Sequence, residues 1–194
     1  MTAPTRLNLK IYQGSTFRQI LRWESATKVY KPITSITNAA PMVITAAAHG
    51  VPQGWRVKLS NVGGMKEANN LDYFIASDVA TNTVTANAIN SIGFSAYTTG
   101  GILEYNLPVD LAGVTARMQL REKVDSATVI HTLTTENNGI LLDNTLKTIT
   151  LEIDESITAQ FSFKSAVYDL ELVKNNDVIP FLTGSVSLTR EVTR

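Results

Sequence analysis

The chain has 194 residues, no cysteine, and 17 basic against 17 acidic side chains, so its formal charge is zero with both histidines neutral. Hydrophobic residues make up 44% of it, enough for a sizeable core, while charged residues at 18% argue against a coiled coil or a disordered acidic tail. The missing cysteines exclude disulfide scaffolds, thiol catalysis and cysteine-ligated zinc, and the balanced charge without a Lys/Arg cluster argues against a nucleic-acid partner.

Strand-forming residues dominate the composition: threonine alone supplies 24 positions, and Val and Ile are plentiful. The first predicted strands are Leu7–Tyr12 and Thr16–Trp23, in which apolar residues fall mostly at every second position. We expect these two strands to form a hairpin turned at residues 13–15.

Between Pro32 and Tyr105 the composition shifts toward Ala, Asn, Gly and Thr, and the predicted strands become short. They are Ile33–Thr37, Met42–Ala47, Arg56–Leu59, Tyr73–Ala76, Thr83–Asn87 and Gly101–Tyr105. We interpret residues 32–105 as a small β module inserted into a surface loop of a host domain, which residues 1–31 and 106–194 form together.

Alternation is clearest over Val114–Arg121, which predicts a strand with Met118 and Leu120 in the core and one polar face toward water. Asp154 is a candidate N-cap for one short helix, Glu155–Gln160. Further strands are predicted at Thr128–Thr134, Lys147–Ile153, Ala166–Val173, Val178–Leu182 and Ser185–Val192. The predicted fold is all-β: an immunoglobulin-like antiparallel β-sandwich of about nine strands carrying a small, barrel-like inserted module.

Two stretches of the host domain carry a resemblance. Leu9-Lys-Ile-Tyr-Gln-Gly-Ser-Thr-Phe17 is followed by Trp23, and Pro108-Val-Asp-Leu-Ala-Gly-Val-Thr-Ala-Arg-Met-Gln-Leu-Arg121 is followed by Tyr168-Asp-Leu-Glu-Leu172. They resemble a β-sandwich of tailed-bacteriophage structural proteins with the pattern QG-x-TF … W … PIDLTGYTARMQIR … YDLEL. In that pattern the tryptophan lies a few residues before the PIDLTG segment, whereas here residues 24–107 intervene, as an insertion would require.

A second resemblance falls within the inserted module. It rests on Ile44-Thr-Ala-Ala-Ala-His-Gly-Val51, Val57-Lys-Leu-Ser-Asn-Val-Gly-Gly-Met65, Asn69-Asn70 and Tyr73. This module is similar to the small β domain named after the first catalytic-cysteine half-domain of ubiquitin-activating enzymes, which phage tail proteins carry as a spacer. No catalytic residue carries over, because this chain has no cysteine.

The resemblances imply a non-enzymatic virion component of the tail, baseplate or fibre-attachment region, assembled in the host cytoplasm in several symmetry-related copies. Its partners would be other virion proteins, with the sandwich docking and the module projecting. The alternatives are a capsid decoration or neck/collar protein and a carbohydrate-binding or receptor-binding adhesin that recognises a host-surface glycan. We expect a soluble protein with no secretion signal and no membrane partner, since no apolar run approaches the roughly 20 residues of a membrane span.

No catalytic, cofactor-binding or metal-ligating residue is predicted. His49 is interpreted as a turn histidine, because no acidic residue flanks it at ligand spacing. Asp169 and Glu171 alternate with apolar neighbours, which favours the solvent side of a sheet over a pair of glycosidase carboxylates.

The candidate surface-recognition residues are the aromatics Trp55, Phe94 and Tyr97, which fall in expected loops of the module. Sugar rings stack on exposed aromatic faces, so these residues are candidates for a glycan platform. The competing interpretation, which we favour, is that they pack in the core of the module.

Overall fold

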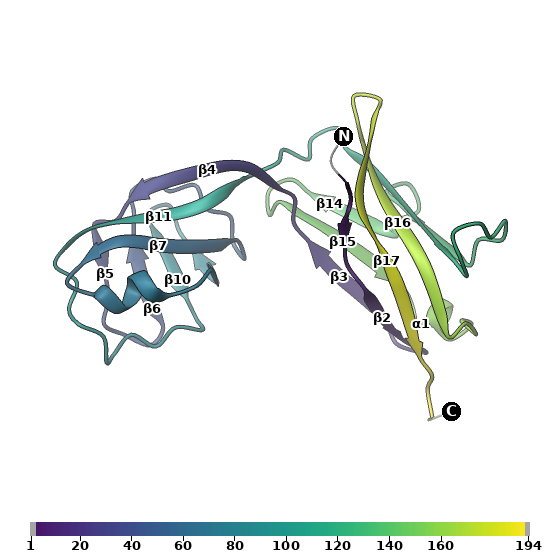
Figure 1. Ribbon diagram of the computed structural model, residues 1–194, viewed down its shortest axis with the longest axis horizontal. Helices are drawn as coiled ribbons and strands as arrows, with labels where there is room; N and C mark the ends of the chain where they lie inside the picture. Colours follow the sequence, from purple (N-terminus) through teal and green to yellow (C-terminus); the bar gives the residue numbers. More distant parts are fainter. Residues whose placement is uncertain (1–2, 193–194) are drawn as a thin grey trace. The chain divides into compact units, whose positions relative to one another are not determined.

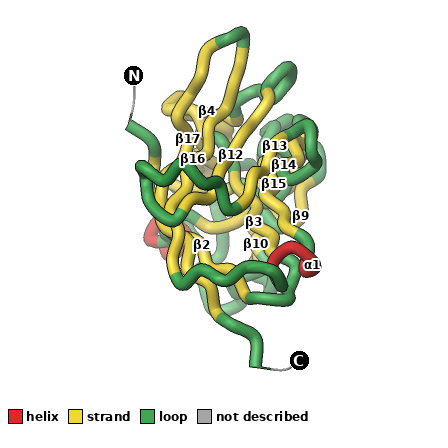
Figure 2. Tube along the Cα trace, turned by 90° about the vertical axis from the view of Figure 1, so that its right-hand side faces the viewer, coloured by secondary structure: helices red, strands yellow, loops and turns green. Residues whose placement is uncertain are grey.

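The computed structural model describes residues 3–192 and confirms the all-β prediction (Figures 1 and 2). The chain divides into two compact units, each with its own hydrophobic core. The sandwich unit comprises the residues up to Trp23 and those from Asp110 onward, and the module unit comprises Glu24–Val109.

Two sheets form the sandwich unit (Figure 1). The larger sheet has the order β1-β17-β16-β12-β13, with β2 also paired to β17, and the smaller has the order β14-β15-β3. The strands of the larger sheet are β1 (Thr5–Arg6), β2 (Leu9–Tyr12), β12 (Thr115–Arg121), β13 (His131–Thr134), β16 (Ser165–Lys174) and β17 (Asp177–Thr189). Those of the smaller sheet are β3 (Phe17–Leu21), β14 (Ile140–Asp143) and β15 (Thr148–Ile153).

The inner faces of these sheets share one core, to which the larger sheet contributes Met118 and Leu170 and the smaller sheet Ile149 and Leu151. Along β12 every second residue is buried, as the alternation of Val114–Arg121 predicts. The two-residue period therefore gives the larger sheet a polar outer face. The immunoglobulin-like assignment stays a prediction.

The predicted hairpin of the first two strands is wrong. β2 and β3 lie in different sheets, because β2 pairs in parallel with β17 while β3 pairs with β15. The residues 13–15 form a turn between the sheets rather than a hairpin. Because β1 also pairs in parallel with β17, the sandwich is not purely antiparallel as predicted.

β17 is one long strand where two were predicted, at Val178–Leu182 and Ser185–Val192. Pro180 and Gly184 look like strand breakers in the sequence. Pro180 lies opposite Glu171, next to a register shift in the ladder with β16, where a missing N–H is tolerated. Gly184 is required by packing, since a Cβ there would lie 2.0 Å from the backbone oxygen of Leu7.

The module unit has two four-stranded sheets, ordered β5-β6-β10-β9 and β4-β11-β7-β8. Its strands are β4 (Glu24–Pro32), β5 (Ser35–Ile36), β6 (Met42–Thr45), β7 (Arg56–Gly63), β8 (Phe74–Ile75), β9 (Asp78–Val79), β10 (Thr83–Ala86) and β11 (Thr99–Pro108). A 3-10 helix, Lys66–Asn70, follows β7.

The module extends further than the predicted 32–105. β4 and β11 pair antiparallel along most of their length, and Glu24 lies opposite Pro108. The two ends of the module are therefore neighbours, which is the geometry that an insertion into a loop needs.

The expected short helix is α1 (Glu155–Thr158), in the sandwich unit between β15 and β16. Asp154 occupies its N-cap position with extended backbone, but its side chain makes no capping hydrogen bond. No helix among the described residues is both long enough and apolar enough to cross a membrane.

Candidate functional site

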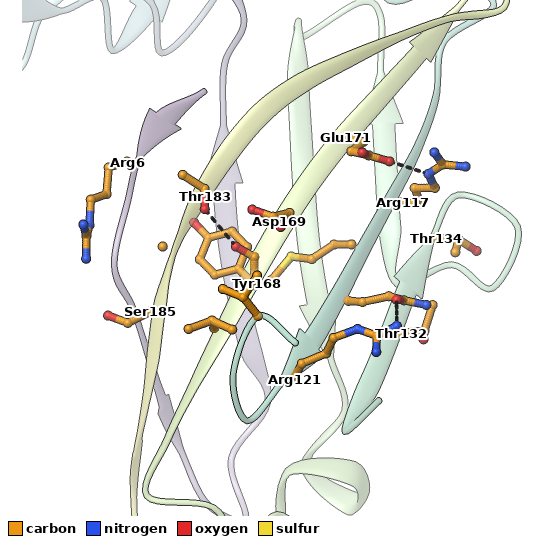
Figure 3. Close-up of a pocket in the computed structure, with 15 residues that line it drawn as sticks. Arg6, Arg117, Arg121, Thr132, Thr134, Tyr168, Asp169, Glu171, Thr183 and Ser185 are labelled. Atoms are coloured by element: carbon orange, nitrogen blue, oxygen red, sulfur yellow. Dashed lines mark hydrogen bonds and ion pairs between the residues drawn. The ribbon is translucent and has the colours of Figure 1, made fainter. Parts of the chain in front are cut away.

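The outer face of the larger sheet is hollowed into a groove of about 650 Å³ in the sandwich unit (Figure 3). Strands β1, β12, β13, β16 and β17 all contribute to it, so residues from both ends of the sequence meet there. Most of its polar side chains stand outward on the strands, because the inward positions are taken by the core.

One row of directly opposed residues crosses all five strands. Thr183 pairs with Arg6 on one side and with Asp169 on the other, and Gln119 continues the row from Asp169 to Thr132. Opposed residues in a sheet have their side chains on the same face. The register therefore brings a guanidinium, a carboxylate, an amide and two hydroxyls into one line.

Only part of the charge in this groove is neutralised internally. Arg117 Nε donates to Glu171 at 2.6 Å. Arg121 donates to the backbone carbonyls of Ser126 and Ala127 and to the amide oxygen of Gln119, and it forms no ion pair with any described residue. Within residues 3–192, neither Arg6 nor Asp169 takes part in an ion pair, although both line the groove.

Beneath the groove, Tyr168 makes a hydrogen bond to the segment between β1 and β2. Its hydroxyl donates to the backbone oxygen of Leu7 at 2.7 Å. Burial, together with the nearby charge of Asp169, raises the pKa of Tyr168 to about 12, so the hydroxyl keeps its proton and remains a donor. Asn8 adds a second contact, since its side-chain oxygen accepts from the N–H of Ser185 at 3.2 Å.

A smaller cleft of about 380 Å³ lies in the sandwich unit beside α1. Phe161 and Phe163 line it, and His131 contacts Phe161 edge to face, with ring centroids 5.9 Å apart. Burial lowers the pKa of His131, because an apolar surrounding disfavours the imidazolium.

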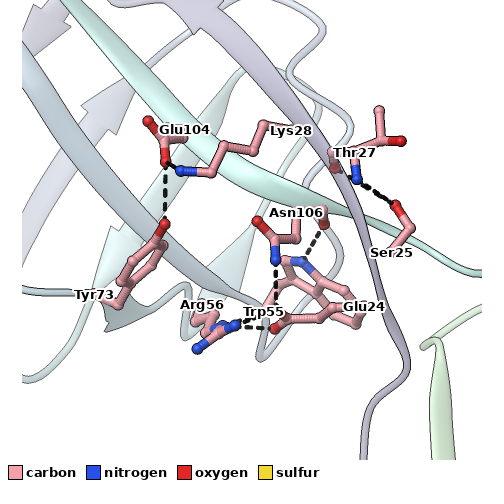
Figure 4. Close-up of polar contacts among 9 residues, drawn as sticks. All are labelled: Glu24, Ser25, Thr27, Lys28, Trp55, Arg56, Tyr73, Glu104 and Asn106. Carbon is pink, nitrogen blue, oxygen red and sulfur yellow. Dashed lines mark hydrogen bonds and ion pairs between the residues drawn. The ribbon is translucent and has the colours of Figure 1, made fainter. Parts of the chain in front are cut away.

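The module unit carries a polar network on the outer face of the sheet β4-β11-β7-β8 (Figure 4). Arg56 forms a bidentate pair with Glu24, whose oxygens lie 2.8 and 2.6 Å from the guanidinium nitrogens. Glu104 receives hydrogen bonds from Lys28 and from the hydroxyl of Tyr73. The hydrogen bond from Lys28 is the main reason that the pKa of Glu104 is lowered.

The three candidate recognition aromatics, Trp55, Phe94 and Tyr97, differ in their exposure. Trp55 is fully buried, and its indole N–H donates to the backbone oxygen of Asn106 at 2.8 Å. Phe94 and Tyr97 are half-buried against the same core. Trp55 fills the centre of this small module and has no ring face to stack on a sugar, as the competing interpretation of core packing predicts; a recognition role for Phe94 and Tyr97 stays a prediction.

His49 is likewise a structural residue. It is buried, and its Nδ1 accepts from the backbone N–H of Val51 at 3.0 Å, while Nε2 lies 3.2 Å from the oxygen of Thr83. In the part of the chain that the structure describes, no three His, Cys, Asp or Glu side chains gather in a metal-binding arrangement.

Alternation along β12 predicts which of its residues point outward but does not predict the groove itself. Arg117, Gln119 and Arg121 follow from alternation, whereas Arg6 lies in a two-residue strand that no pattern marks. Comparison with known proteins adds no assignment: no family model matches the sequence, and no curated protein matches it.

Proposed function

We propose that this chain is a non-enzymatic structural protein of a tailed-bacteriophage virion, from the tail, baseplate or fibre-attachment region. In this proposal the sandwich unit docks to neighbouring virion proteins, and the module unit is the part presented to a further partner. Repetition of one modest interface around a symmetric ring would give stable assembly without any single strong contact.

The observation that carries the proposal concerns the two phage-like motifs of the sandwich. The segment that ends in Thr-Ala-Arg-Met-Gln-Leu-Arg121 forms β12, and the Tyr-Asp-Leu-Glu-Leu172 segment lies on β16. These strands are direct neighbours, with Arg117 opposite Glu171 and Gln119 opposite Asp169. The motif residues thus supply both the core of the sandwich and the central wall of the groove, which supports the groove as the docking surface.

Charge also favours docking at this face. Arg6 and Asp169 lie in one row and are separated by a single strand, β17. Neither forms an ion pair among the described residues, so a partner segment with complementary charges gains two contacts without breaking any existing ones.

Localisation in the particle tests the proposal. We expect the protein in virions purified from the host that expresses it, and a cryo-EM map should show it in several symmetric copies. Its absence from purified particles would reject the virion role.

The docking surface is tested by complementing particles that lack the protein with charge-reversed chains. Arg6→Glu and Asp169→Lys should each reduce incorporation into particles, whereas Arg18→Gln, on the outer face of the smaller sheet, should not. Equal incorporation of all three variants would place the interface elsewhere.

A further inference from the structure

The module unit has a second feature that suggests binding, a row of residues on its outer sheet face. Glu104 lies opposite Tyr30 on one side and opposite Lys58 on the other, and the side chain of Tyr73 reaches the same face. The order across the face is therefore Tyr30 on β4, Glu104 on β11, Lys58 on β7 and then Tyr73, the residue immediately before β8. Three strand spacings separate the backbones of the two tyrosines, about 14 Å, but the Tyr73 side chain leans across the row and places its hydroxyl 3.0 Å from Glu104 Oε1.

Both tyrosines present ring surface to solvent. Tyr30 is 57% exposed and Tyr73 is 39% exposed. Arg56 lies 5.1 Å from the ring centroid of Tyr73 (Figure 4), and the amine of Lys58 lies 5.8 Å from the same centroid, so two cations hold that ring in place. Exposed aromatic rings, of which Tyr73 has its orientation fixed by these contacts, are suited to stack on the polarised C–H groups of a sugar.

The polar groups between the rings supply hydrogen bonds and one unbalanced charge. Both hydrogen bonds of Glu104 use its Oε1, so Oε2 accepts none from the described residues. Lys28 is paired with Glu104 and Arg56 with Glu24. Of the three cations on this face, Lys58 alone forms no ion pair within residues 3–192.

We propose that this face binds a glycan that carries a carboxylate, with the carboxylate at Lys58 and sugar rings on Tyr30 and Tyr73. The free oxygen of Glu104 accepts from a sugar hydroxyl. Two carboxylates on the same face, Glu24 and Glu104, disfavour a nucleic acid with its phosphate at every residue. The site lies wholly within the module unit and does not depend on the proposed virion role.

The test uses the full chain on an array of immobilised uronic-acid, sialylated and neutral glycans, with a poly(dT) oligonucleotide in parallel. We expect binding to a carboxylated glycan that exceeds binding to neutral glycans and to the oligonucleotide. Tyr30→Ala and Lys58→Gln should each weaken it by at least about tenfold without a large change in the melting temperature of the module, since Tyr30 is exposed and Lys58, though half-buried, lies outside the core.

Tyr12→Ala is the matched control. Tyr12 is 53% exposed and has the amine of Lys10 4.7 Å from its ring centroid, but it lies in the sandwich unit. Its loss should leave glycan binding unchanged. The proposal is overturned if no carboxylated glycan binds, if Lys58→Gln binds as well as the parent chain, if Tyr12→Ala binds as weakly as Tyr30→Ala, or if the oligonucleotide binds more tightly.

Discussion

The two units complete their cores from different parts of the chain. Every strand of the module unit comes from Glu24–Val109, and its ends pair with one another, Glu24 opposite Pro108. The sandwich unit takes strands from both sides of the module and joins residues as distant as Ser187 and Leu9, 178 positions apart. The module is thus self-contained in sequence, whereas the sandwich depends on segments that only folding brings together.

This difference predicts that the two units melt as separate cooperative transitions, each sensitive to its own core. The largest effect is expected for Met118→Asp in the sandwich. Met118 is 2% exposed, so the substitution buries an unpaired carboxylate and should cost about 4 kcal/mol or more. Differential scanning calorimetry should show that the sandwich transition collapses while the module transition is retained.

The control for that experiment is Arg117→Ala on the neighbouring, outward position of β12. The Arg117 side chain is 58% exposed and its ion pair with Glu171 is a surface pair, so the loss should stay under about 1 kcal/mol. Similar losses for both substitutions would mean that the register of β12 is incorrect.

The reciprocal change is Trp55→Ala in the module. Removing this fully buried ring leaves a cavity and an unused carbonyl at Asn106, at a cost of about 3–5 kcal/mol. Here the module transition should shift and the sandwich transition should not. A common shift of both transitions would contradict the independence of the two cores.

A smaller effect is expected where the first strands pack onto β17. Gly184→Ala places a methyl group against the backbone of Leu7 and should cost about 1–3 kcal/mol, because backbone must move to admit it. Hydrogen exchange should increase at residues 5–12. Gly93→Ala is the control, because a Cβ there has open space; an equal loss at Gly93 would exclude the close approach at Gly184 as the cause.

The smallest effect concerns pH and His131. Its pKa is lowered in the folded sandwich by burial, so the unfolded chain binds more protons near and below the ordinary pKa of 6.5. The stability contribution is complete above that value and falls as pH decreases toward the folded pKa. The sandwich transition should therefore move to lower temperature between pH 7 and pH 5, and His131→Gln should reduce that shift. An unchanged pH profile in His131→Gln would assign the dependence to other groups.

Two factors decide how much of this fold can be predicted from the sequence: the solvent exposure of each strand, and the sequence distance between a strand and its partner. β12 was predictable because one of its faces is buried and the other is exposed to solvent. β4 was missed because most of its nine residues are exposed or half-exposed, so its sequence does not alternate. The partners of β2 and β3 were wrong because both strands pair with segments more than a hundred residues away, which local pattern does not encode.

The candidate sites were harder to predict than the strands. Alternation marks Gln119 and Asp169 as outward, but their alignment with Arg6 requires the parallel pairing of β1 on β17. Trp55 was ambiguous for a different reason, since a tryptophan beside a loop is compatible with a stacking platform as well as with the centre of a small core, the interpretation that the sequence favours.

The parallel pairing of β1 and β2 on β17 also bears on the order of events during translation. Both strands leave the ribosome early, yet their hydrogen-bonding partner on β17 is synthesised only after the whole of Glu24–Val109. Every strand of the module pairs with another strand of the module. The module can therefore fold before the strands that pair with β1, β2 and β3 have been synthesised. During that interval the apolar residues Leu9, Ile11 and Phe17 are uncovered on the nascent chain, which makes them natural contact points for a chaperone.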